Sequence, residues 1–239
     1  MSDNDPLGSV PDLSDWPTAN TWINARLRAL AKESFSPSVR ATFTSVTPTV
    51  HSDPTFGPYA SSEWRKFALA TFLADWATYD APADRADFPR FLYVAGTFPA
   101  GFRLWMCRLD DGLYTPVGYT GWYAVSKSIF DLLAARPETI THRGFMAPLP
   151  RLDPGGSFIY LFNASIVPQL RNQSDQSRLL MKQFADDLAE IPKKGLASVT
   201  VSQDGARFSS RFGMCHTGEL IVDGSSEHIY TLSKENLWH

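Results

Sequence analysis

The sequence predicts an α/β fold in which helices flank a central mixed sheet. Two segments, Ser61–Tyr79 and Gln176–Ile191, carry apolar residues at spacings of three and four, as helices with one buried face do. Two others, Ser157–Ile166 and Leu196–Val201, are rich in β-branched and aromatic residues and indicate strands. Asp110-Asp111-Gly112 is a hairpin signal. Alternation of these patterns predicts one sheet covered by helices.

The same patterns predict the remaining elements. We expect further helices over Thr18–Ser34, Ser126–Ala135 and Gly205–Met214, and further strands over Val39–Val50, Phe91–Val94, Phe102–Leu109, Tyr114–Tyr123, Glu219–Val222 and His228–Leu232. The last two strands form a hairpin about Asp223-Gly224, and Glu138–Gly156 is a long loop. We expect the strands from Phe102 to Val201 to share one sheet, with the Gln176–Ile191 helix packed on it.

The domain organisation follows from composition along the chain. Met1–Pro17 is polar and acidic, so we expect a mobile leader and not a signal peptide. Residues 18–239 are expected to form a single domain with an N-terminal helical extension. The chain has 239 residues, of which 44% are hydrophobic and 13% aromatic, which is typical of a packed globule.

Charge and cysteine content exclude several classes of function. Lys+Arg number 22 and Asp+Glu 25, a net charge of −3, so nothing drives binding to nucleic acid or to an anionic membrane. No apolar run is long enough to span a membrane. The chain has two cysteines and no CxxC, which favours the reducing cytoplasm. No cluster has metal-ligand spacing, so no metal is expected.

The segment from Ile166 to Leu180 is the strongest candidate for a binding site. A strand ends at Ile166, Pro168 and Arg171 follow, and a helix opens after a short polar loop. The N–H groups of a first helical turn and the positive end of the helix dipole attract anions. The sequence therefore predicts an anion site here.

The same residues resemble a known family. The GNAT superfamily of acyltransferases has the pattern V-x-P-x-x-R-x-x-G-x-G/A-x-x-L-L at its donor-binding turn. Five positions match in register: Ile166, Pro168, Arg171, Leu179 and Leu180. Ser174 and Gln176 stand where the family has glycine, and a Cβ there hinders close approach to a pyrophosphate. With the elements that follow, the resemblance covers roughly Phe102–Leu232.

The resemblance implies a divergent GNAT-like acyltransferase with an acyl-CoA or acetyl-CoA co-substrate, or acyl carrier protein as donor. It implies that the donor contacts Ile166, Arg171, Ser174, Gln176 and Ser177. The backbone of Asn163–Ile166 would pair with the pantetheine arm.

The catalytic residues are less well marked. Ser209 lies near the position of a family tyrosine that protonates the departing thiolate. Serine is a poorer acid, so either another group protonates the thiolate or water does. We expect the base to be Tyr160, His51, His216 or an ordered water. Asp186, Asp187 and Glu190 are expected to form the solvated face of their helix.

The predicted reaction is direct attack of an amine, on a small molecule or a protein, on the thioester. The acceptor and the oligomeric state do not follow from the sequence. The competing interpretation is a non-catalytic GNAT-shaped module that binds a ligand or a partner, which the residues at positions 174, 176 and 209 favour.

Overall fold

The structure is a computed structural model of the chain. It describes residues 5–10, 16–32, 43–46, 62–79, 96, 98–135, 153, 155–171, 174–222 and 225–233. His51, Phe91–Val94, Asp223-Gly224 and most of the loop predicted over Glu138–Gly156 lie outside the described residues. No helix in the described ranges is both long enough and apolar enough to cross a membrane.

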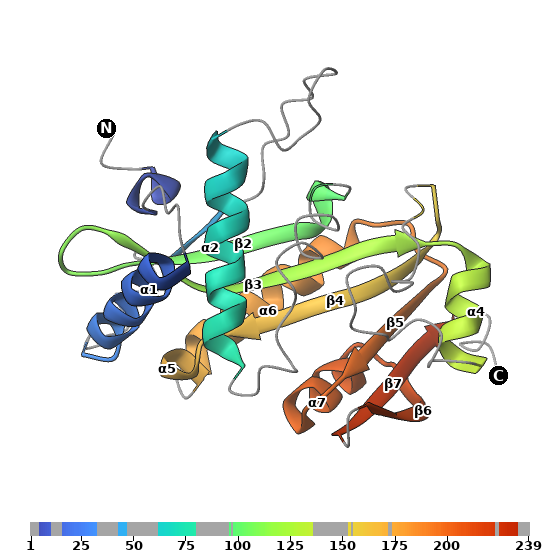
Figure 1. Cartoon of the computed structure of the whole chain (residues 1–239). Helices are drawn as coiled ribbons and strands as arrows, with labels where there is room; N and C mark the ends of the chain where they lie inside the picture. The colour runs from blue at the N-terminus through green and yellow to red at the C-terminus, as the bar shows by residue number, and fades with distance from the viewer. Residues whose placement is uncertain are drawn as a thin grey trace. The chain divides into compact units, whose positions relative to one another are not determined.

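A seven-stranded mixed sheet organises the fold, with the strand order β1-β2-β3-β4-β5-β7-β6 (Figure 1). Its strands are β1 (Phe43–Val46), β2 (Phe102–Arg108), β3 (Tyr114–Val125), β4 (Phe158–Ile166), β5 (Gly195–Thr200), β6 (Cys215–Val222) and β7 (Ser225–Ser233). The four strands predicted between Phe102 and Val201 all belong to this sheet, so the predicted α/β class is confirmed.

The chain divides into two compact units. Unit 1 consists of Met1–Thr120 and Ser165–Asp187, and unit 2 consists of Gly121–Ala164 and Leu188–His239. The strands β3 and β4 contribute residues to both units. Each unit is described by itself below.

Unit 1 has one apolar core, which helices and strands share. Its described helices are η1 (Pro6–Ser9), α1 (Trp16–Leu30), α2 (Ser62–Thr78), η5 (Pro99–Gly101), α5 (Pro168–Arg171) and most of α6 (Ser174–Ala189). The core cluster joins α1 to the strands and to α5 and α6, with Ile23, Leu30, Trp105, Val117, Leu170 and Leu180 among its members. Burial of such side chains contributes about 1.5–3 kcal/mol each, which explains why the amphipathic patterns predicted α1, α2 and α6.

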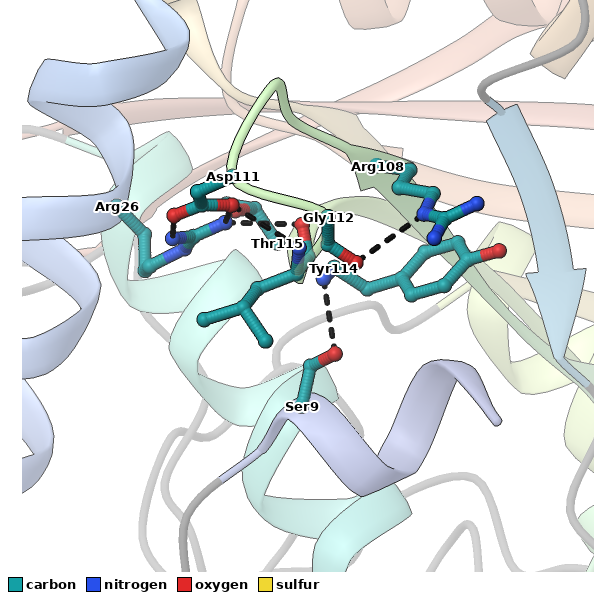
Figure 2. Close-up of polar contacts among 8 residues, drawn as sticks. Ser9, Arg26, Arg108, Asp111, Gly112, Tyr114 and Thr115 are labelled. Carbon is teal, nitrogen blue, oxygen red and sulfur yellow. Dashed lines mark hydrogen bonds and ion pairs between the residues drawn. The ribbon is translucent and has the colours of Figure 1, made fainter. Parts of the chain in front are cut away.

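A buried arginine fixes the β2–β3 hairpin of unit 1 to α1 (Figure 2). The Arg26 guanidinium forms an ion pair with Asp111, and it donates to Thr115 Oγ1 at 2.9 Å and to the Leu113 carbonyl at 2.9 Å. The Arg26 side chain is only 9% exposed, whereas that of Asp111 is 49% exposed. The hairpin signal is confirmed by Gly112, whose φ of +78° suits glycine. The turn at Gly112, which glycine favours locally, is thus also held by an ion pair between residues far apart in the sequence.

A second ion pair fastens α6 to the sheet. Arg103 on β2 donates to both carboxylate oxygens of Asp187, at 2.7 and 2.6 Å, and Gln183 donates to the same carboxylate at 3.1 Å. The prediction that Asp187 lies on a solvated face is therefore wrong, because its side chain is only 20% exposed. The neighbouring Asp186 is exposed and pairs with Lys182.

Unit 2 carries the C-terminal strands side by side, with α7 (Gln203–Arg211) packed on β5 and β7 (Figure 1). α4 (Lys127–Ala135) contacts β7 and begins after Ser126, whose hydroxyl accepts from the Ile129 N–H at 3.3 Å as the predicted cap does.

Several boundaries differ from the predictions for local reasons. α7 begins before the predicted Gly205 because the Ser202 hydroxyl caps it, accepting from the Gly205 N–H at 3.1 Å. Pro168–Arg171, predicted as loop, forms the short α5, and proline suits the first position of a helix. Within the predicted leader, η1 is structured: the Ser9 hydroxyl accepts from the Tyr114 N–H at 2.9 Å.

Replacing Asp111 by Asn should lower the free energy of unfolding by about 1–2 kcal/mol at pH 7, because the buried charge of Arg26 would lose its carboxylate partner. The loss is not larger because the side chain of Asp111 is half-exposed. The Arg26 hydrogen bond lowers the pKa of Asp111. The difference from the unmodified protein should therefore persist down to about pH 4 and shrink below it, as the wild-type carboxylate becomes protonated. Urea unfolding of both proteins at several pH values measures this.

The matched control is Asp131→Asn, which removes an exposed pair with Lys127. It should change the free energy of unfolding by less than about 0.5 kcal/mol. An equal loss in both variants would show that Asp111 contributes no more than a surface charge.

Candidate functional site

The predicted donor turn lies in unit 1 and is centred on Arg171. Its guanidinium donates from Nε to the Ile166 carbonyl at 3.3 Å and from Nη2 to the Thr78 carbonyl at the end of α2. The Arg171 residue is exposed, and in the described part of the chain no carboxylate pairs with it. Among the described residues, its positive charge is thus held in place by carbonyls and not paired with an acid.

The N-terminus of α6 follows this arginine. Ser174 begins the helix, and Gln176 and Ser177 lie in its first turn. Asp175 in the same turn is exposed and lies 3.8 Å from Arg178, a long ion pair. Arg171 precedes the start of α6 at Ser174 by three residues, and both a guanidinium and a helix N-terminus attract anions. The predicted donor contacts of Ile166, Arg171, Ser174, Gln176 and Ser177 stay a prediction.

Unit 2 contains the strands on which the catalytic candidates lie. The parallel register of β4 with β5 consists of four pairs, from Phe158–Gly195 to Leu161–Ser198. Within the described residues the register ends there, although β4 runs on to Ile166 and β5 to Thr200. On its other side β5 pairs with β7 over its whole length. Past Leu161, the backbone of β4 does not take β5 as its partner.

Tyr160 and Ser209 lie on opposite faces of the sheet. Tyr160 pairs with Ala197, and its ring lies 5.2 Å from that of Tyr123. The next residue of β5, Ser198, shares a hydrogen bond of 2.8 Å with the Ser209 hydroxyl on α7. Successive side chains of a strand point to opposite faces, so these two candidates are not brought together.

Ser209 has no exposed surface. Its hydroxyl and that of Ser198 satisfy one another, and the Ser198 hydroxyl also lies 4.0 Å from the Met214 sulfur. A buried hydroxyl of this kind holds a helix on a strand. Its role as an acid remains a prediction without support from its surroundings.

His216 lies on the Ser209 face of the sheet, two strands away. It pairs with Tyr230 of β7, which in turn pairs with Ser198 of β5. Its ring centroid lies 5.4 Å from those of both Tyr230 and His228. His216 is exposed, so it is accessible to a substrate. The sequence did not indicate the adjacent His228 as a candidate, because the register between β6 and β7 that brings the two histidines together cannot be read from the sequence.

No group of three or more His, Cys, Asp or Glu side chains within the described ranges is arranged to hold a metal ion.

Comparisons with known proteins found similar structures but no protein of similar sequence among families or curated proteins. No protein-family model matches the sequence, and no curated protein matches it. Many solved structures are similar. The loading GNATL domain of CurA from Lyngbya majuscula has a TM-score of 0.55 at 12% identity, over 81% of this chain and 98% of that one.

Two further structures are similar. The GphF GNAT-like decarboxylase in complex with isobutyryl-CoA has a TM-score of 0.50 at 19% identity, over 70% of this chain and 94% of that one. The mosquito arylalkylamine N-acetyltransferase like 5b has a TM-score of 0.50 at 7% identity, over 80% of this chain and 100% of that one. This chain therefore has the GNAT fold, in a divergent sequence.

Proposed function

We propose that this chain transfers an acyl group from a thioester donor, acyl-CoA or acyl carrier protein, to an amine of a small molecule or protein. The observation that carries the proposal is the short β4–β5 register, which ends at Leu161–Ser198. A strand backbone that is not paired with its neighbour can pair with an extended ligand. The pantetheine arm is such a ligand, and its amides match the donors and acceptors of a strand.

The turn at Arg171 supports the part of this proposal that concerns the phosphate of the donor. Its guanidinium and the N-terminus of α6 offer charge and N–H groups to a phosphate. Among the similar structures, GphF was solved with isobutyryl-CoA. CoA and a phosphopantetheine carrier share the phosphate and the pantetheine, so both donors suit this site.

In the proposed reaction the amine nitrogen attacks the thioester carbonyl carbon. A C–N bond forms, the C–S bond breaks, and the thiolate leaves. A base takes one proton from the attacking nitrogen, and the thiolate receives one from an acid or from water. Backbone N–H groups of β4 would stabilise the negative charge on the carbonyl oxygen. Holding both substrates in this geometry accounts for much of the acceleration.

The second candidate function is a module that binds an acyl ligand or a partner without chemistry. The burial of Ser209 against Ser198 favours it, because the position that resembles the family's acid offers no accessible proton. Thioester binding without acyl transfer to any amine would support this function over the first.

Replacing Arg171 by Ala should weaken the binding of a phosphate-bearing donor by about 1.5–3 kcal/mol, the range for a hydrogen bond to a charged group. Isothermal titration calorimetry with CoA and an acyl-CoA measures this. Arg178→Ala, which removes an exposed charge from the neighbouring helix α6, is the control and should bind nearly as the unmodified protein does. Equal affinity of the Arg171 variant and the unmodified protein would contradict the proposed contact.

Restoring the glycines, Ser174→Gly with Gln176→Gly, should tighten CoA binding if side chains at these positions crowd the pyrophosphate. The unmodified protein should bind free CoA weakly, and acyl-CoA more tightly by up to about 0.8 kcal/mol for each buried CH₂ of the acyl chain. Calorimetry on both proteins tests this. Tight binding of free CoA by the unmodified protein would contradict the crowding.

We expect the base to be Tyr160, His216, His51 or an ordered water. Because Tyr160 and His216 lie on opposite faces of the sheet, at most one of them serves a given acceptor. At most one of the variants Tyr160→Phe and His216→Ala should then lower the initial rate, by roughly 10²-fold.

The variants Asp186→Ala and Glu190→Ala are the controls for proton transfer, because their side chains are exposed on or just after α6. They should keep the full rate. A lowered rate in either control would overturn this assignment. Full rates in the Tyr160, His216 and His51 variants alike would leave water as the base, which solvent isotope effects on the rate would test.

A further inference from the structure

We propose that Arg171 is a positioning residue that couples occupation of the donor site to the ordering of the last turn of α2. This inference rests on the proposed function and goes beyond it, because it assigns to one guanidinium a link between two parts of unit 1. Both carbonyls that Arg171 contacts, Ile166 and Thr78, belong to that unit.

The Thr78 carbonyl is one of the last four of α2, which have no partner inside the helix. The negative end of the helix dipole lies there as well, and a cation is favourable at that end. The Thr78 hydroxyl donates to the Ala74 carbonyl at 2.8 Å, one turn earlier in the helix, whereas the orphan carbonyl of Thr78 accepts from Arg171. Arg171 thus acts as a C-terminal cap supplied by a distant segment.

The same helix is held to the sheet close to its end. Asp75, 1% exposed, accepts a hydrogen bond of 2.8 Å from the Tyr119 hydroxyl on β3. The last turn of α2 therefore lies between a buried contact at Asp75 and a part-buried one at Arg171, whose own residue is exposed. Of these two, the Arg171 contact is the one whose side chain a ligand in solution can reach.

An arginine has five N–H donors in a rigid planar fork. Arg171 directs Nε to Ile166 and Nη2 to Thr78, and no other partner occurs for it within the described residues. An anion can therefore bind the remaining N–H groups without displacing either carbonyl. Binding would immobilise an exposed side chain while it still holds Thr78, and so would order the end of α2.

Coupling of this kind is reciprocal. A second ligand that orders the last turn of α2 would therefore raise the affinity for the donor by the same factor. Two such ligands would bind cooperatively through Arg171 without direct contact between them. A surface arginine that only attracts phosphate would produce no such link.

Hydrogen exchange over residues 72–79, measured by mass spectrometry with and without saturating CoA, tests the proposal. Without ligand, Arg171→Ala should speed exchange there by roughly fivefold, the low end of typical coupling, and Arg178→Ala should not. CoA should slow exchange in the unmodified protein and in Arg178→Ala by a similar factor. In Arg171→Ala, CoA should leave the exchange of this segment unchanged even at saturation.

Arg171→Lys keeps the charge but lacks the planar fork, so it should bind CoA and yet show a reduced effect on α2. Unchanged exchange in ligand-free Arg171→Ala, or an equal effect of CoA with and without Arg171, would overturn the coupling while the proposed function stands. Absence of binding of CoA, acyl-CoA and acyl carrier protein alike to the unmodified protein in calorimetry would overturn both.

Discussion

The parallel pairing of β4 with β5 is the constraint on which the rest of the fold depends. β5 is hydrogen-bonded to β7 along its whole length but to β4 over four pairs only. The crossover through α6 that joins the two strands places the positive end of that helix after β4. The crossover through α6 is thus accompanied by two features: strands β4 and β5 that pair over part of their length, and a helix N-terminus that attracts anions. The backbone of β4 past Leu161 must find its partners elsewhere, on β3 or outside the sheet.

Ion pairs then hold long segments onto this frame. Arg103 fastens α6 through both oxygens of Asp187, and Arg26 fastens the β2–β3 hairpin through Asp111. Both pairs join residues far apart in the sequence, and a planar guanidinium suits such bidentate contacts. Arg171 differs from them because it bonds carbonyls and keeps its charge unneutralised within the described residues. That difference is what makes it suitable for a ligand.

Elements with a strong local pattern were predictable from the sequence. The helix from Ser62 to Thr78, the turn at Gly112 and the cap at Ser126 each follow from apolar spacing or from local hydrogen bonding. The partner of Asp187 was not predictable, because an exposed and a paired aspartate have the same place on the helix pattern. Likewise, no periodicity indicates that Tyr160 and Ser209 lie on opposite faces, since this depends on the register between strands.

The divergence of the sequence fits the proposed donor site, in which backbone groups would make most of the contacts. Main-chain N–H and C=O groups keep their positions as long as the strand register and the helix end persist, whatever side chains they carry. Side-chain positions such as Ser174, Gln176 and Ser209 can then change without loss of the frame. This accounts for similarity to GNAT structures at 7–19% identity when no family model matches the sequence. If binding depends on the backbone and Arg171, and proton transfer depends on side chains, then donor binding and catalysis are separable properties of this chain.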